Sequence, residues 1–175
     1  MCSSDLHAIP PHASLYAVPY SWYSKYGVRR YGFHGTSHHY VSQQAAAALG
    51  REESDCRVIT AHLGNGCSAA AVANGICIDT TMGLTPLEGL IMGTRSGDVD
   101  PGLHEFMVRV SGKSLATITD ILNRKSGLLG ISEKSNDMRV LLDAADAGDE
   151  QAGLAVDMFC YRLAKSLAGL AVALG

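Results

Sequence analysis

The sequence predicts a mixed fold of the α/β or the α+β class, and three observations carry this prediction. Three short segments with strand character follow one another within residues 57–81. Segments with helical periodicity occupy most of residues 101–174, and a long glycine-rich loop, residues 82–102, joins the two regions. Strands in succession followed by helices are typical of both classes, and hydrophobic periodicity alone does not separate them.

The composition of the 175 residues fits a chain that buries a core. Hydrophobic residues make up 47% and charged residues 18%, which is typical of globular proteins. The net charge of −3 argues against nucleic acid as a partner. No apolar run reaches the ~18 residues that a membrane helix needs, so we expect no membrane span.

The five cysteines are widely spaced and form no CxxC pair, so the sequence suggests neither a disulfide framework nor a zinc site. We interpret Cys67 and Cys77 as small buried hydrophobic side chains. The simplest compartment for such a chain is the reducing cytoplasm.

The region before the strands is expected to be mostly irregular at first and then helical. Residues 1–31 are loop-like, because three prolines interrupt any long helix there. Residues 38–49 predict a helix that ends at Gly50. A polar connector, residues 52–55, follows.

Residues 57–81 predict a three-stranded antiparallel meander. Residues 57–62 form a β-branched run, and residues 68–73 and 76–81 are the second and third candidates. Asn74-Gly75, between the last two, is the strongest hairpin dipeptide of the chain.

The loop at residues 82–102 has little regular pattern, and loops of this length inside a compact domain are usually functional. Helical spacing then predicts four helices, at residues 101–110, 114–124, 137–147 and 149–174. The last of them carries an apolar stripe.

Three histidines lie within residues 34–39. His34 and His38 have the i, i+4 spacing of helical metal ligands. Gly35 weakens a helix between them, however, and the glutamate of an HExxH motif is absent. A metal pair is therefore one interpretation among several.

Two other interpretations of the same segment stay open. Thr36 or Ser37 can cap the N-terminus of a helix. Alternatively, His34 is a polar catalytic group beside the apolar Phe33.

Two glycine-containing turns are candidates for phosphate contacts. Residues 62–66 place two glycines after a strand, where exposed amides can form an anion nest, although a plain hairpin turn explains them equally well. Arg95 lies between Gly93 and Gly97 in the long loop, where its fork can pair with phosphate oxygens. The alternative for Arg95 is a surface ion pair with a nearby aspartate, Asp98 or Asp100.

Asp137 and Arg139 lie at the start of a predicted helix. They can cap that helix, or they can grip a ribose or a base edge. The spacing alone leaves both interpretations open.

Several of these segments together resemble the acetate kinase family. The matching motifs follow in order: YGFHGTSH at 31–38, ITAHLGNG at 59–66, DTTMGLTPLEG at 79–89, MGTRSG at 92–97 and KSGLLG at 125–130. YAVPY at 16–20 and YRLAK at 161–165 also match. The likeness extends from about His7 to Gly175.

The resemblance implies a fold of the acetate and sugar kinase–actin superfamily, in which two ribonuclease-H-like domains close on a nucleotide. It places the end of the first domain and an inter-domain helix at residues 7–56. Residues 57–175 would be the second domain, incomplete at its C-terminus, and residues 1–6 look foreign to the family. We therefore expect an internal fragment, less than half of the usual family length.

The resemblance also implies roles for particular residues. His34 and Arg95 correspond to the family's transition-state-stabilising histidine and arginine, and Phe33 and Pro86 match positions that line a small methyl pocket. Two groups correspond to the ATP site: the phosphate-binding turn, made of His62, Leu63, Gly64, Asn65 and Gly66, and the adenosine segment, made of Asp137, Met138 and Arg139.

The implied reaction is phosphoryl transfer from ATP to acetate, giving acetyl phosphate and ADP, with Mg²⁺ as the metal. The implied partners are these small molecules, with no membrane, and a homodimer for a full-length protein. The family's magnesium-binding glutamate, first phosphate loop and carboxy-terminal adenosine loop are absent from the sequence, so we expect little or no kinase activity from the chain alone. Propionate kinase and a non-catalytic nucleotide-binding module are the alternatives.

Overall fold

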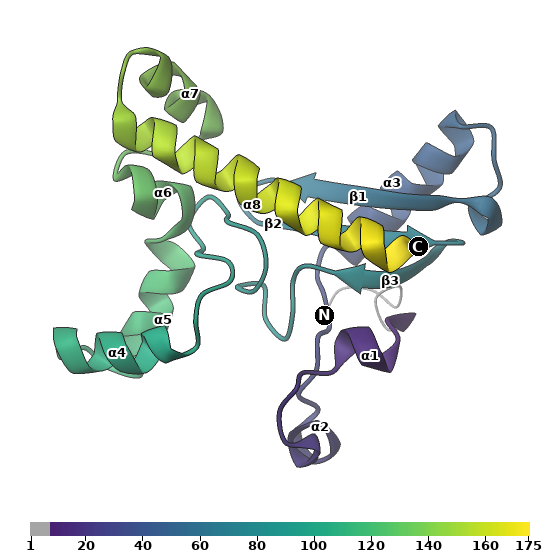
Figure 1. Ribbon diagram of the computed structural model, residues 1–175, viewed down its shortest axis with the longest axis horizontal. Coiled ribbons are helices and arrows are strands. Elements are labelled where there is room, and N and C mark those ends of the chain that lie inside the picture. Colours follow the sequence, from purple (N-terminus) through teal and green to yellow (C-terminus); the bar gives the residue numbers. More distant parts are fainter. Residues whose placement is uncertain (1–7) are drawn as a thin grey trace. The chain divides into compact units, whose positions relative to one another are not determined.

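The computed structural model describes residues 8–175 (Figure 1), and the chain divides into two compact units. The first unit contains the described residues up to Leu63, together with Ser68–Gly89 and Ala164–Gly175. The second contains Gly64–Cys67 and Leu90–Leu163. The proposed leader, residues 1–6, lies outside the described residues, and the expected domain division at residue 57 stays a prediction.

The first unit is built on a three-stranded sheet, which confirms the predicted meander. Its strands are β1 (Arg57–Leu63), β2 (Cys67–Ala73) and β3 (Ile76–Thr80), in the order β1-β2-β3. β2 pairs antiparallel with β3. The predicted turn joins them, with φ of 55° at Asn74 and 76° at Gly75, as a tight hairpin requires at both central positions.

Two short helices occur within residues 11–26, where the sequence predicted a loop-like region without a long helix. α1 spans Pro11–Ser14 and α2 spans Tyr20–Tyr26. The prolines do not interrupt them, because Pro11 is the first residue of α1 and Pro19 is the N-cap of α2, positions that need no intrahelical amide bond.

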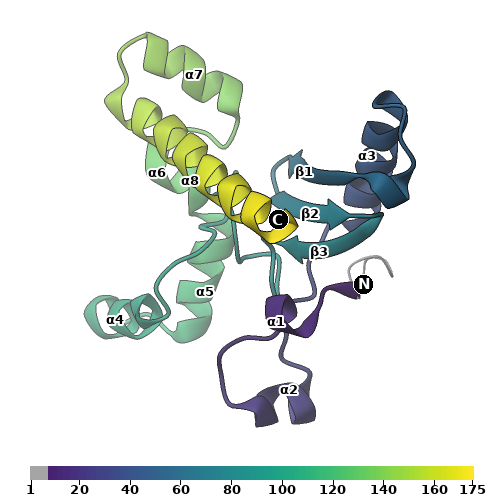
Figure 2. The ribbon, with the colours of Figure 1, turned by 45° about the vertical axis from the view of Figure 1, so that its right-hand side comes forward.

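The next helix, α3 (Gly35–Ala48), begins three residues earlier than predicted. A short 3-10 turn, η2 (Glu53–Asp55), then leads into the sheet. Figure 2 shows α3 beside β1, and α1 beside β3. One of the two helices beside the sheet, α3, therefore carries the histidine motif.

The central strand β2 is buried along most of its length. Ala69, Ala70 and Ala71 have no exposed surface. Small side chains suit a strand that has neighbours on both faces, because they let the covering elements approach closely. Ala70 packs with Ile9 and Cys77 in a small cluster on one face.

A polar cluster joins the first part of the long loop to Tyr16 and Arg30, which precede the sheet in the sequence. Glu88 forms an ion pair with Arg30 at 2.8 Å and accepts a hydrogen bond from the Tyr16 hydroxyl. The Leu84 amide donates to the same hydroxyl at 2.8 Å. Burial and the hydrogen bond to Glu88 hold the pKa of Tyr16 above its ordinary value, so the phenol stays a neutral donor.

We expect Tyr16→Phe to lower the free energy of unfolding by ~1–3 kcal/mol, because it leaves the Leu84 amide and the Glu88 carboxylate without this partner. The matched control is Tyr31→Phe. The Tyr31 hydroxyl donates to Gly27 O at 2.7 Å in an exposed position, where water replaces the lost bond. Urea unfolding followed by circular dichroism measures both, and equal losses would show that the Tyr16 hydrogen bonds do not stabilise the loop.

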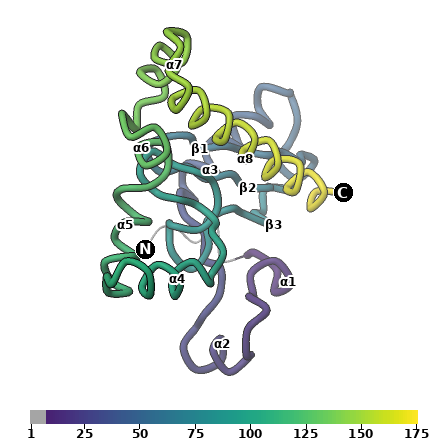
Figure 3. Tube along the Cα trace, turned by 60° about the vertical axis from the view of Figure 1, so that its left-hand side comes forward, coloured from purple at the N-terminus to yellow at the C-terminus, as the bar shows by residue number. Residues whose placement is uncertain are grey.

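The second unit is helical: α4 (Gly102–Ser111), α5 (Leu115–Arg124), α6 (Gly127–Ser132), α7 (Met138–Asp146) and α8 (Glu150–Leu174). Figure 3 shows α4, α5, α6 and α7 following one another before the chain turns into α8. Four of these helices were predicted. The short α6 was missed, because two glycines in its six residues hide any helical pattern.

The core of the second unit joins three of its helices. Leu128 of α6, Leu141 of α7, and Ala152 and Ala155 of α8 are buried together. The apolar stripe predicted for α8 is only partly covered, because Leu170 is buried whereas Cys160 is exposed. α8 contributes its residues up to Leu163 to this unit and the rest to the first unit.

The predicted long loop contains no helix or strand from residue 81 to residue 100, yet residues 92–95 are firmly held. The amides of Ser126, Leu128 and Leu129 donate to the carbonyl oxygens of Thr94, Met92 and Gly93 at 2.9–3.0 Å. Met92 N also donates to Arg95 O at 3.1 Å. We call residues 92–95 the clasped segment, since backbone bonds along its length replace regular structure.

Among residues 8–175, no helix combines the length and the apolar character that a membrane crossing requires.

Candidate functional site

His34 has a backbone conformation that is unusual for its residue type. It precedes α3 with φ of 60° and ψ of 23°, in the left-handed region, and makes no side-chain capping bond. A non-glycine residue there costs ~1–3 kcal/mol, and such strain clusters at functional sites. The predicted cap by Thr36 or Ser37 is wrong, because the helix begins at Gly35.

The side chain of His34 joins a hydrogen-bonded chain that links α3 to two strands. His34 Nδ1 lies 2.8 Å from Ser68 Oγ on β2. The same oxygen lies 2.8 Å from His38 Nε2, and His38 Nδ1 lies 2.8 Å from Thr60 Oγ1 on β1. Ser68, His38 and Thr60 are all buried.

A third histidine completes the cluster. The rings of His34 and His62 stack with their centroids 4.0 Å apart and their planes inclined by 19°. Ser37 Oγ lies 3.0 Å from His62 Nδ1. The structure thus brings together His34 and His62, two residues that the sequence assigned to different roles.

Burial, with smaller contributions from the charges of His34 and His62, lowers the pKa of His38 from 6.5 to about 4. His38 is therefore neutral near pH 7, with one donor nitrogen and one acceptor nitrogen. Both nitrogens face hydroxyl oxygens, so His38 has none left for a metal. Among residues 8–175, no group of three or more His, Cys, Asp or Glu side chains could hold a metal ion.

We expect the stability contributed by His38 to be fully present above pH 6.5 and to be lost as the pH falls toward 4. In that window the unfolded chain binds a proton that the folded chain excludes, so unfolding is favoured by up to ~3 kcal/mol. Urea unfolding at several pH values measures this slope. His38→Gln should flatten it and the exposed His12→Gln should not, and a slope that persists in His38→Gln would contradict the assignment.

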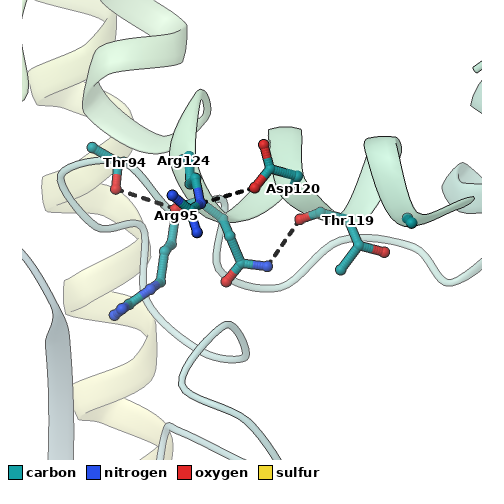
Figure 4. A pocket seen from close by; sticks show the side chains of 7 residues that line it. Thr94, Arg95, Thr119, Asp120 and Arg124 are labelled. Atoms are coloured by element: carbon teal, nitrogen blue, oxygen red, sulfur yellow. Dashed lines mark hydrogen bonds and ion pairs between the residues drawn. The ribbon is translucent and has the colours of Figure 1, made fainter.

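Arg95 belongs to the second unit, at the end of the clasped segment. Its Nη1 lies 3.8 Å from Met92 Sδ. A cavity of about 530 Å³ lies between Thr94, Arg95 and the polar face of α5. Figure 4 shows the guanidinium directed away from the ion pair of Arg124 and Asp120, two residues that also line this cavity.

The turn predicted to bind phosphate divides between the units: His62 and Leu63 belong to the first unit, and Gly64, Asn65 and Gly66 to the second. Leu63, Gly64 and Asn65 are exposed. The amide of Gly64 donates to Gly66 O at 3.2 Å, which closes the turn.

Asn65 links this turn to two other segments of the second unit. Its backbone oxygen accepts from the Gly93 amide at 3.1 Å, and its Oδ1 accepts from Asn136 Nδ2 at 2.9 Å. A Cβ on Gly93 would lie 2.3 Å from Asn65 Oδ1, so any other residue there would displace the Asn65 side-chain amide. The predicted phosphate turn and the predicted adenosine segment are thereby adjacent.

In the predicted adenosine segment, the capping interpretation is confirmed. Asp137 is the N-cap of α7, and its Oδ1 accepts from the Arg139 amide at 2.9 Å. Arg139 Nη2 lies 3.0 Å from Asp137 Oδ2 in an exposed pair. Met138 is the first residue of the helix and is half-buried. A ribose contact by these residues stays a prediction.

The two residues predicted to line a methyl pocket lie in segments that touch. The amides of Tyr31 and Gly32 donate to Gly83 O at 3.1 and 3.2 Å. Phe33 follows directly, and Pro86 lies three residues after Gly83; both are half-buried. The first unit therefore holds the two segments together.

Cys67 and Cys77 are buried, as predicted. Cys56, Cys67 and Cys77 are free and buried, and Cys160 is free and exposed. Burial raises the pKa of Cys67 to about 11 and that of Cys77 to about 12, so neither is a thiolate nucleophile near pH 7.

The sequence did not identify Ser68 and Thr60, although a signal was present. Ser68 stands at the start of an alanine-rich strand, and Thr60 is the polar member of a β-branched run. A polar side chain in a strand predicted to be buried needs a partner, and His38 provides it here.

Comparison with known proteins identifies matches over nearly the whole chain. The model of the acetokinase family matches residues 3–175. An acetate kinase from Deinococcus deserti is 62% identical over 168 residues, which are 95% of this chain and 42% of that protein. The chain therefore spans less than half the length of this curated relative.

Two solved structures are similar. The crystal structure of Porphyromonas gingivalis acetate kinase matches 98% of this chain and 43% of its own, with a TM-score of 0.95 and 49% identity. A propionate kinase from Francisella tularensis subsp. tularensis SCHU S4 matches 97% of this chain and 43% of its own, with a TM-score of 0.92 and 47% identity.

Proposed function

This chain belongs to the acetokinase family, and on that premise we propose that it forms part of an enzyme that transfers a phosphoryl group from ATP to acetate. The observation that carries the proposal is the family match over residues 3–175, within which the strained His34 joins a buried hydrogen-bonded cluster. The fold is that of the acetate and sugar kinase–actin superfamily, as predicted.

In the proposed step, an acetate carboxylate oxygen attacks the γ-phosphorus of ATP. The new O–P bond forms as the bond from phosphorus to the ADP oxygen breaks. Negative charge spreads over three equatorial oxygens, so the reaction needs positioned positive groups and donors more than a strong base.

Arg95 suits the role of a permanent positive charge. The clasped segment fixes its backbone, and Gly93 lets the chain approach Asn65 closely. A guanidinium stays charged at any physiological pH and can pair with two phosphate oxygens.

His34 suits the role of a hydrogen-bond donor to the phosphoryl group. Its backbone is fixed in a strained conformation, and its ring is positioned by Ser68 on one side and stacked on His62. Pre-organised donors of this kind need no rearrangement as charge develops.

We propose that the turn of residues 64–66 contacts ATP phosphates through its backbone amides, and that residues 137–139 lie near the adenosine. The Asn65–Asn136 hydrogen bond supports this assignment, because it keeps the two segments adjacent. We assign no step to Mg²⁺, since the described residues do not gather the carboxylates that such an ion would need.

A chimera tests the proposed function. In it, this chain replaces the matched 42% of the Deinococcus deserti acetate kinase. With ATP, acetate and hydroxylamine, the chimera should produce acetyl hydroxamate, and the signal should require both substrates. A folded chimera that binds ATP in isothermal titration but yields no hydroxamate would instead support a nucleotide-binding module.

Propionate is the second candidate acceptor, because a propionate kinase is among the similar structures. One methylene changes binding by only ~1–3 kcal/mol, so both acids are plausible substrates of one pocket. The ratio of kcat/KM for acetate to that for propionate in the chimera decides between them.

The free cysteines support a proposed location in the reducing cytoplasm.

A further inference from the structure

Three buried side chains form a chain of hydrogen bonds that ends at His34. Thr60 Oγ1, the ring of His38 and Ser68 Oγ are joined at 2.8 Å each, and Ser68 Oγ is also 2.8 Å from His34 Nδ1. We call Thr60, His38 and Ser68 the relay. Its exposed fraction is 4% or less at every member, so water does not supply alternative partners.

The relay has two arrangements in which Ser68 uses its own proton. Ser68 could also accept from both histidines, but its buried proton would then have no acceptor, which costs ~1–3 kcal/mol. Each hydroxyl has one proton and neutral His38 has one, so when Ser68 donates, every bond along the line points the same way. In the outward arrangement, Thr60 donates to His38 Nδ1, His38 Nε2 donates to Ser68, and Ser68 donates to His34 Nδ1. In the inward arrangement, every bond is reversed and His34 Nδ1 donates.

The end of the relay decides between the two. Among the described residues, the Thr60 hydroxyl has one hydrogen-bond partner, which is His38 Nδ1. In the outward arrangement, the Thr60 proton is used in that bond. In the inward arrangement it has no acceptor there, and leaving a buried donor unpaired costs ~1–3 kcal/mol.

We propose that the relay is directed outward and thereby keeps the proton of His34 on Nε2. His34 Nδ1 then accepts from Ser68, and the Nε2–H group is a donor of fixed orientation. The relay residues are positioning residues, and the consequence for catalysis rests on the proposed function. The consequence for the His34 tautomer does not.

The proposal explains why this cluster is more than a packed core. A neutral histidine whose Nδ1 accepts a hydrogen bond has its proton on Nε2. The partner of Nδ1 therefore determines which ring nitrogen can donate. The low pKa of His38 supports the same arrangement, because a cationic His38 would donate from both nitrogens and break the single direction.

Nuclear magnetic resonance tests the tautomer on the 175-residue chain itself, without any need for kinase activity. Long-range ¹⁵N–¹H correlation spectra of ring-labelled histidine distinguish protonated from unprotonated ring nitrogens. At pH 7 we expect protonated Nε2 and unprotonated Nδ1 in both His34 and His38. A proton on Nδ1 of either residue would overturn the proposal.

Matched serine variants test the cause. Ser68→Ala removes the donor to His34, so His34 should become a mixture of tautomers. Ser42→Ala is the control, because Ser42 is also buried but donates to His39 O at 2.8 Å, outside the relay. An unchanged His34 tautomer in folded Ser68→Ala would overturn the proposal, and Thr60→Val, which removes the donor at the other end, serves in its place if Ser68→Ala does not fold.

A pair of His38 variants in the chimera tests the effect on catalysis. Glutamine keeps an amide donor near the position of Nε2, whereas leucine fills similar space without one. We expect His38→Leu to lower kcat by ~10–100-fold, the range found when a group that orients a metal-bound histidine is removed, with KM for ATP nearly unchanged. His38→Gln should retain most of kcat, and equal losses in the two variants would overturn the positioning role.

Discussion

Replacing Arg95 by alanine in the chimera is expected to lower kcat by ~10³-fold or more, the effect of an arginine that stabilises a transferring phosphoryl group. KM for ATP should change only modestly, because the charge that Arg95 meets is largest in the transition state. Hydroxamate formation measures kcat. Isothermal titration with ATP measures binding independently.

Two further variants serve as controls for Arg95→Ala. Arg95→Lys keeps the charge but loses the fork, so we expect an intermediate rate. Arg109→Ala removes an exposed arginine that lies over Phe106 on α4, and it should leave kcat as it was. An Arg95→Ala enzyme with the rate of the Arg109→Ala enzyme would remove Arg95 from the mechanism.

The substitution Gly127→Ala is expected to cause the largest loss of stability. Gly127 has φ of +60°, and a Cβ there would lie 2.2 Å from Met92 O and 2.6 Å from Arg95 O. The backbone of the clasped segment would have to move, and its hydrogen bonds to residues 126–129 would break. We expect a loss of ~3–5 kcal/mol in the free energy of unfolding.

Gly112→Ala is the matched control, because Gly112 has φ of +68° and nothing within 4 Å of its added Cβ. It should lose only the ~1–2 kcal/mol of left-handed strain. Chemical denaturation of both variants separates this strain from steric overlap. Similar losses in the two variants would show that overlap with the clasped segment is not the cause.

The strands and the long helices could be predicted from the sequence, because their signals are local. The β-branched run of β1, the Asn74-Gly75 turn and the periodicity of α8 each extend over consecutive residues. The short helices α1 and α6 could not, since a helix of four or six residues depends on tertiary packing rather than on propensity.

The histidines of the candidate site could be predicted from the sequence, but their hydrogen-bond partners could not. The sequence around His34 shows a histidine cluster, and its spacing is compatible with metal ligation, with helix capping and with catalysis. The structure adds Ser68 and Thr60, which lie 34 and 22 residues from their histidine partners. Contacts at such separations depend on how α3 packs against β1 and on where β2 places Ser68, which no local pattern encodes.

The clasped segment has a consequence for protein engineering. Its conformation depends on main-chain amides and carbonyls, together with Gly127, where an added Cβ would overlap main-chain oxygens of the segment. The side chain at position 94 contributes one hydrogen bond, to Asn123 O at 3.2 Å, and borders a polar cavity. Substitutions at position 94 can therefore change the shape of the cavity wall while the backbone of the clasped segment keeps its conformation.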